Sequence, residues 1–237
     1  MNFTTIRFLK STFIRLRLHV FFSWLTGFSQ QLIWMTRLSK WVSENRNISF
    51  NDFPSKWDYT KRYLLYKNVI ETEQLYHEIN YLEFGVADGH SFNWWMEENR
   101  DEGSRFYGFD TFTGLPEDFG PYKKGTFNTG NNIPLIWDNR GQFFQGLFQQ
   151  TLSVFLKSFD NKKRSVIMLD ADLYTATLFT LTSLAPFLKK GDILFFDEFV
   201  VPTHEFMAYR HFIDSYYFEL ELIGAANNYY FVAFKVV

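Results

Sequence analysis

From residue 79 onward, apolar runs of strand length alternate with longer segments of helical character. The strand-like runs are 81–85, 105–109, 165–169 and 192–196, and the helix-like segments are 91–98, 146–158, 175–188 and 206–216. This alternation is typical of an α/β fold, in which helices cover both faces of a mostly parallel sheet. The tail predicts two more strands, 218–223 and 229–236, which would close the sheet with an antiparallel hairpin.

Composition separates the chain into two parts. Residues 1–50 hold seven Lys or Arg and one acid, a net charge of +6, whereas the remainder has a net charge of −8. We therefore expect an N-terminal extension over 1–54 and one folded domain over 55–237. The chain has no cysteine, which excludes disulfides, thiolate metal sites and a cysteine nucleophile.

The N-terminal extension is aromatic, basic and predicted to be helical. Its longest uncharged stretch, 20–36, includes several polar residues and is slightly short for a membrane-spanning helix, and no cleavage site typical of a signal peptide follows. Two interpretations stay open: a lid or cap on the domain or on a sister subunit, or a helix on a membrane surface. We expect a cytoplasmic protein, with membrane association or homo-oligomers as options and with no nucleic-acid partner.

A glycine-containing turn follows the first predicted strand. Gly85 and Gly89 allow close approach of the backbone to a ligand, and Glu83 ends the strand where it can reach a cationic amine. Asp110 ends the second strand, where an acid can accept hydrogen bonds from ribose hydroxyls. The alternative is a tight turn beside a surface acid. A nicotinamide site is disfavoured because Gly-x-Gly-x-x-Gly is absent.

Acids also follow the next two strands, Asp170 and Asp172 after one and Asp197 and Glu198 after the other. Four carboxylates converging at one sheet edge repel each other unless a cation neutralises them. Oxygen ligands without sulfur favour Mg²⁺, or else Mn²⁺ or Ca²⁺. Such a metal could hold an acceptor hydroxyl while a fourth carboxylate takes its proton. The alternative is that these acids cap helices.

Several strings together resemble the macrocin O-methyltransferase family. They are Tyr81-Leu82-Glu83-Phe84-Gly85-Val86, the run from Tyr107 to Glu117, Gly146 to Leu152, Leu169-Asp170-Ala171-Asp172-Leu173-Tyr174, and Lys190 to Phe199. The resemblance covers about residues 55–237. It implies a Rossmann-like class I methyltransferase fold with a seven-stranded sheet, S-adenosylmethionine as cofactor, and Mg²⁺-dependent methylation of a hydroxyl on a sugar, glycan or glycosylated natural product.

The resemblance also implies roles for individual residues. It implies Asp172 as the general base and Asp170, Asp197 and Glu198 as metal ligands. The implied cofactor contacts are Glu83, Gly85, Val86, Gly89, Ser91, Asp110, Thr111, Phe112 and Asp170. One departure is Asp197-Glu198-Phe199, where the family usually has Asp-Asp-Tyr. The rival interpretations are a catechol-type O-methyltransferase and a non-catalytic scaffold protein that keeps the fold.

Overall fold

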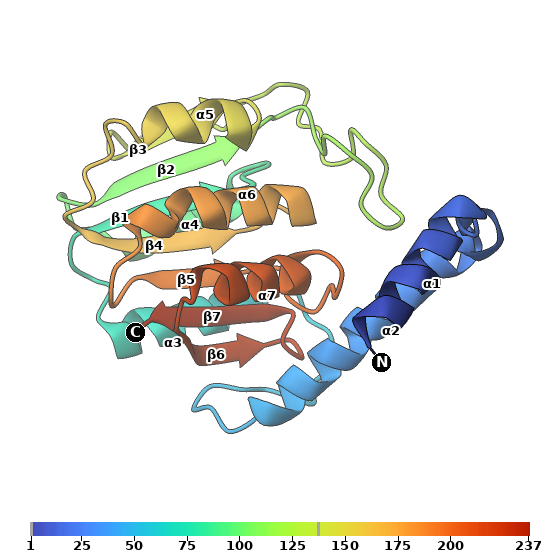
Figure 1. Cartoon of the computed structure of the whole chain (residues 1–237). Helices are drawn as coiled ribbons and strands as arrows, with labels where there is room; N and C mark the ends of the chain where they lie inside the picture. The colour runs from blue at the N-terminus through green and yellow to red at the C-terminus, as the bar shows by residue number, and fades with distance from the viewer. Residues whose placement is uncertain (1, 137) are drawn as a thin grey trace.

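The computed structural model describes residues 2–136 and 138–237, which form a seven-stranded sheet between two layers of helices (Figure 1). The strands are β1 (Ile79–Phe84), β2 (Arg105–Asp110), β3 (Gly141–Gln145), β4 (Arg164–Leu169), β5 (Ile193–Phe196), β6 (Leu220–Ala226) and β7 (Phe231–Val236). The helices are α1 (Phe3–Arg15), α2 (His19–Glu44), α3 (Lys61–Glu73), α4 (His90–Glu98), α5 (Phe148–Phe155), α6 (Tyr174–Leu184) and α7 (Glu205–Tyr216), with a 3₁₀ turn at Ala185–Phe187.

The strand order is β3-β2-β1-β4-β5-β7-β6. The first five strands are parallel, and β7 pairs antiparallel with both β5 and β6. The predicted α/β fold with a closing antiparallel pair is therefore confirmed. The chain order reverses direction between β1 and β4, and in open α/β sheets ligands bind at such a point, beyond the carboxyl ends of the strands.

Alternation along the strands creates two separate cores. On β1, Leu82 and Phe84 face α5, α6 and α7, whereas Ile79 and Tyr81 face α3 and α4. Successive strand residues point to opposite faces, so a central strand covered on both faces is apolar throughout. β1 and β5 are buried along their whole length. The sheet is thus fixed from both sides, which gives its carboxyl edge a rigid base.

Two helices precede the domain. The second half of α2 packs on the domain through Trp34, Leu38 and Trp41, which form one stripe at helical spacing. Trp41 lies against Phe199, with ring centroids 4.9 Å apart. By contrast, residues 2–33, which we call the N-terminal arm, include no buried residue, and they extend away from the domain as a helical hairpin (Figure 1).

Among the residues that the structure describes, no helix is both long and apolar enough to cross a membrane.

Candidate active site

Backbone hydrogen bonds just beyond the ends of β4 and β5 fix the positions of Asp170 and Asp197. The amide of Asp170 donates to the carbonyl of Phe84 at 2.9 Å, and the amide of Asp197 donates to the carbonyl of Leu169 at 3.0 Å. Both acids are therefore held at the carboxyl edge of the sheet. We call Asp170, Asp172, Asp197 and Glu198 the acidic edge.

The glycine turn, residues 85–89, lies directly against this edge. Gly85 has φ +96°, and a Cβ there would be 1.7 Å from the carbonyl oxygen of Asp170. No side chain fits at this position. Asp110, half-buried at the end of β2, accepts hydrogen bonds at one carboxylate oxygen from the amides of Val86 (2.7 Å) and Ala87 (2.8 Å). The structure thus joins β1, β2 and β4 around the predicted cofactor turn.

Glu83 lies fully buried beneath the glycine turn. Its two carboxylate oxygens accept hydrogen bonds from the hydroxyls of Ser91 (2.6 Å) and Tyr81 (2.5 Å). Burial raises the pKa of Glu83 from 4.5 to about 8, although both hydroxyls oppose the shift. The predicted contacts Glu83 and Ser91 therefore pair with each other, and Glu83 has no exposed surface to offer a ligand directly.

The raised pKa of Glu83 predicts an unusual pH dependence of stability. The folded chain keeps this proton between about pH 4.5 and about pH 8, where the unfolded chain has lost it, so the contribution of Glu83 falls as pH rises. Urea unfolding at several pH values should show a steeper loss of stability in the wild type than in Glu83→Gln, by up to about 1.4 kcal/mol per pH unit. Parallel pH profiles for the two proteins would contradict this account of Glu83.

A cation from α3 neutralises part of the acidic edge. One guanidinium nitrogen of Arg62 lies 2.9 Å from Asp170 and 2.8 Å from Asp197. Its other nitrogens donate to the hydroxyls of Tyr66 (3.0 Å) and Tyr59. The guanidinium group also packs over the rings of Tyr59 and Phe231, and Arg62 is only 3% exposed.

Arg62 was not among the site residues predicted from the sequence. The available signal was the acidic edge itself, which requires a cation, together with a basic residue among tyrosines spaced for one helix face. The described residues contain no group of three acidic or histidine side chains arranged to hold a metal ion. The predicted ligands Asp170, Asp197 and Glu198 therefore do not fit a metal in this arrangement, since Arg62 lies between two of them.

Asp172 and Glu198 form the outer part of the acidic edge. Burial raises the pKa of Asp172 to about 9, with further contributions from the charges of Asp170 and Glu198 and from a hydrogen bond to Glu198. Glu198 also accepts a hydrogen bond from the hydroxyl of Tyr230 at 2.5 Å. Asp172 is thus a strongly basic carboxylate, and it holds a proton at neutral pH until a cation or a donor group changes its surroundings.

Three turns beyond the strand ends contain a non-glycine residue in the left-handed conformation. They are Ala87 after β1 (φ 46°), Phe112 after β2 (φ 57°) and Asp172 after β4 (φ 60°). Such residues cost about 1–3 kcal/mol each and are concentrated at functional sites. Phe112 is fully buried and its ring packs on Phe143, so this predicted cofactor contact has no exposed surface in the structure.

The loop from β2 to β3 folds over one end of the acidic edge. The carboxylate of Glu117 accepts a hydrogen bond from the hydroxyl of Thr175 at 2.6 Å, and Phe119 packs on His204 with centroids 4.9 Å apart. Leu115, Phe119 and Leu173 form a small buried cluster next to Asp172. Thr111, another predicted contact, is half-buried at the start of this loop, and its hydroxyl donates to the carbonyl of Gly114 at 2.9 Å.

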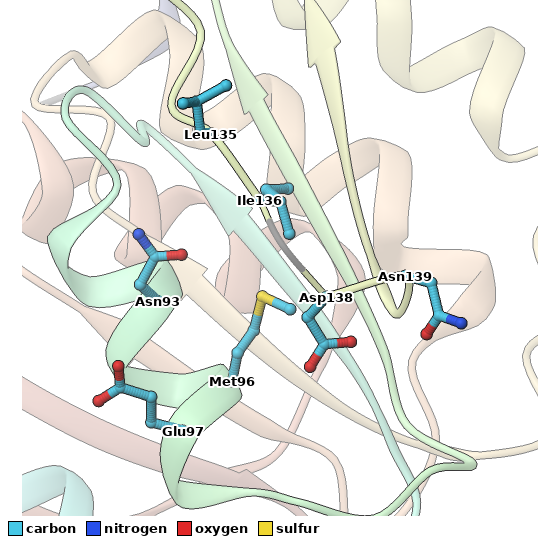
Figure 2. Close-up of a pocket in the computed structure, with 7 residues that line it drawn as sticks. All are labelled: Asn93, Met96, Glu97, Leu135, Ile136, Asp138 and Asn139. Carbon is cyan, nitrogen blue, oxygen red and sulfur yellow. The ribbon is translucent and has the colours of Figure 1, made fainter.

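A groove of about 760 Å³ lies beside the glycine turn, since a Cβ on Gly89 would be 3.6 Å from the side-chain amide of Asn93, one of the lining residues. Figure 2 shows its lining side chains on α4 and on the segment before β3: Asn93, Met96, Glu97, Leu135, Ile136, Asp138 and Asn139. None of these residues belongs to the glycine turn or the acidic edge. We therefore place the candidate active site at the carboxyl edge, where the polar groups converge, and not in this groove.

Comparisons with known proteins show which proteins the chain is similar to. Residues 82–199 match a family model described as a methyltransferase domain, a span that includes the glycine turn, Asp110 and the acidic edge. The calicheamicin methyltransferase CalS11 has the same fold with a TM-score of 0.56 and 22% identity, covering 75% of this chain and 78% of its own. The O-methyltransferase NovP gives a TM-score of 0.58 and 18% identity, covering 76% and 79%.

A third structure, described as cmcI-D160 Mg-SAM, gives a TM-score of 0.51 and 15% identity, covering 84% of each chain. A comparison with curated protein sequences finds no match. The sheet topology and the glycine turn at the carboxyl edge are thus those of a class I methyltransferase fold. Within it, residues 82–199 are similar to a methyltransferase domain. The narrower resemblance to macrocin O-methyltransferases stays a prediction.

Proposed function

We propose that this protein transfers the methyl group of S-adenosylmethionine to a hydroxyl group of a sugar-type acceptor. One observation carries the proposal: the methyltransferase topology brings the glycine turn, Asp110 and the acidic edge together at one carboxyl edge. CalS11, described as a TDP-rhamnose 3'-O-methyltransferase, has the same fold and supports a sugar hydroxyl as the acceptor.

The residues at the edge fit this cofactor by their chemistry. S-adenosylmethionine supplies a sulfonium-bound methyl group, an α-amino group and two ribose hydroxyls. The acidic edge presents four carboxyl groups against the single guanidinium of Arg62. Burial and mutual repulsion raise the pKa values of Asp172, Asp197 and Glu198, so a bound cation would favour their charged forms. Asp110 is half-buried and can accept hydrogen bonds from ribose hydroxyls.

Asp172 is the proposed proton acceptor. Methyl transfer forms a bond from the acceptor oxygen to the methyl carbon, breaks the carbon–sulfur bond, and releases the hydroxyl proton. Burial and the neighbouring acids favour the protonated form of Asp172. Once a bound cation has displaced its own proton, the carboxylate can take up the proton that the acceptor hydroxyl releases. The proposed step involves no metal, because Arg62 already pairs with two of the predicted metal ligands, Asp170 and Asp197.

Calorimetric titration with S-adenosylmethionine, with and without Mg²⁺, tests the proposal. We expect binding that Asp110→Ala weakens by about 1–3 kcal/mol, as for the loss of a hydrogen-bonded charged partner. Asp118→Ala is the matched control, because Asp118 is an exposed acid that pairs with Lys123 at 2.8 Å in the neighbouring loop. It should bind as the wild type does.

The outcomes separate the candidate functions. Binding followed by turnover with diol sugars supports the proposal. Turnover with catechols alone would show that the acceptor is a catechol and not a sugar. Absence of binding in both conditions would overturn the enzyme assignment and favour a scaffold protein that retains the fold. Thermal unfolding of Asp110→Ala must be measured in parallel, since Asp110 also holds the amides of Val86 and Ala87.

A further inference from the structure

The N-terminal arm exposes an unusual amount of apolar surface. Phe3 (79%), Trp24 (76%), Phe28 (69%) and Phe21 (68%) are largely exposed, although a water-soluble domain normally covers such large side chains. They belong to α1 and the first half of α2, which pack against each other through the stacked rings of Phe13 and Phe22. The arm thus buries little apolar surface within itself.

The charge of the arm points to the chemistry of its partner. The arm contains Arg7, Lys10, Arg15 and Arg17, and the first acid of the chain is Glu44. A second copy of this arm would bring like charges together. An anionic lipid surface instead attracts each basic residue near it by about 1 kcal/mol and takes up exposed aromatic side chains at its interface.

We infer that the N-terminal arm binds the surface of an anionic lipid bilayer and lies in the interface without crossing it. The length and polarity of the helices are consistent with this mode, since none of the described helices could span a membrane. The inference is independent of the proposed function, because vesicle binding requires neither cofactor nor acceptor.

The attachment of the arm also determines which side of the domain faces the bilayer. The side-chain amide of Gln31 donates to the hydroxyl of Thr203 at 3.0 Å, and Thr203 lies in the segment between β5 and α7. The arm therefore leaves the domain beside the carboxyl ends of the strands, and Figure 1 shows it on the side to which the arrowheads of β2 and β4 point. An arm on the bilayer brings the candidate active site close to the membrane surface.

Vesicle sedimentation with the full chain tests the inference. The vesicles are phosphatidylcholine alone or phosphatidylcholine with about a third phosphatidylglycerol. We expect sedimentation with the anionic vesicles, weakened by added salt, and much less with the neutral ones. Changing the four basic residues of the arm to Gln should lower the affinity at least about tenfold. The control changes four exposed lysines of the domain to Gln and should have little effect: Lys67, Lys157, Lys162 and Lys190.

A second variant, Phe21→Ser with Trp24→Ser, tests the apolar contribution and should also reduce sedimentation. Both residues are exposed, so the fold is retained, which circular dichroism and S-adenosylmethionine titration can verify. Equal binding to both kinds of vesicle, or no binding to either, would overturn the inference. So would a dimer in light scattering that Phe21→Ser with Trp24→Ser dissociates, because the apolar surface would then belong to a contact between copies.

Discussion

Replacing Arg62 by Met is expected to destabilise the folded chain by about 3–5 kcal/mol, the cost of breaking a buried ion pair from one side. Asp170 and Asp197 would lose the guanidinium that lies within 2.9 Å of both, and the hydroxyls of Tyr59 and Tyr66 would lose a donor. Urea unfolding near neutral pH measures the change. The loss should shrink in acid, where the carboxylates take up protons.

Binding of Mn²⁺ to a variant and to its control tests whether Arg62 is the cation of this site. Arg62→Met should bind Mn²⁺, detected as loss of the free-ion signal in electron paramagnetic resonance, whereas the wild type should not. Arg164→Met is the matched control, because Arg164 pairs with Glu73 at 2.6 Å outside the acidic edge and is partly exposed. It should lose only about 1 kcal/mol and gain no metal binding. Mn²⁺ binding that is equally tight in the wild type and Arg62→Met would contradict the assignment.

Gly85→Ala is expected to have a comparably large effect. A Cβ at this position would lie 1.7 Å from the carbonyl oxygen of Asp170, and the φ of +96° is unfavourable for any side chain. The backbone would have to move, which breaks the hydrogen bond from Gly85 to Phe109 (3.0 Å) at the end of β1. We expect a loss of about 4 kcal/mol or more in the free energy of unfolding, measured by urea denaturation.

Gly27→Ala provides the control for the glycine substitution. Gly27 lies within α2, and a Cβ there would have no atom within 4 Å. Alanine should therefore be neutral or stabilise the helix by about 0.5–1 kcal/mol. If Gly85→Ala were as stable as Gly27→Ala, the close contact between the glycine turn and β4 would not exist in solution.

The sequence predicted most of the sheet because its central strands are unambiguous. The runs at 165–169 and 192–196 correspond to β4 (Arg164–Leu169) and β5 (Ile193–Phe196). These strands are apolar because helices cover the sheet on both faces. β3 was not assigned. Its residues, Gly141–Gln145, include two glutamines and are half-buried or exposed at the edge of the sheet, so they lack the pattern of a covered strand.

The site was predicted in part, for a physical reason. Acids at strand ends follow from the order of residues along the chain, so the convergence of β1, β2, β4 and β5 could be foreseen. The position of Arg62 was not predicted, because it depends on how α3 packs on the face of the sheet that it shares with α4. Likewise, the burial of Glu83 beneath its own turn depends on Tyr81 and Ser91, which no spacing rule identifies.

The left-handed turns at Ala87, Phe112 and Asp172 also have a consequence for protein engineering. The left-handed backbone conformation at these three positions of the carboxyl edge is unfavourable and offsets part of the stability that comes from the two cores. A laboratory selection for heat resistance alone would favour glycine or asparagine at Ala87 and Asp172, since both tolerate this conformation, whereas the buried ring of Phe112 would be kept for its packing on Phe143. A selection that also required turnover would keep the aspartate at 172, and the difference between the two outcomes would locate the catalytic edge without any knowledge of the acceptor.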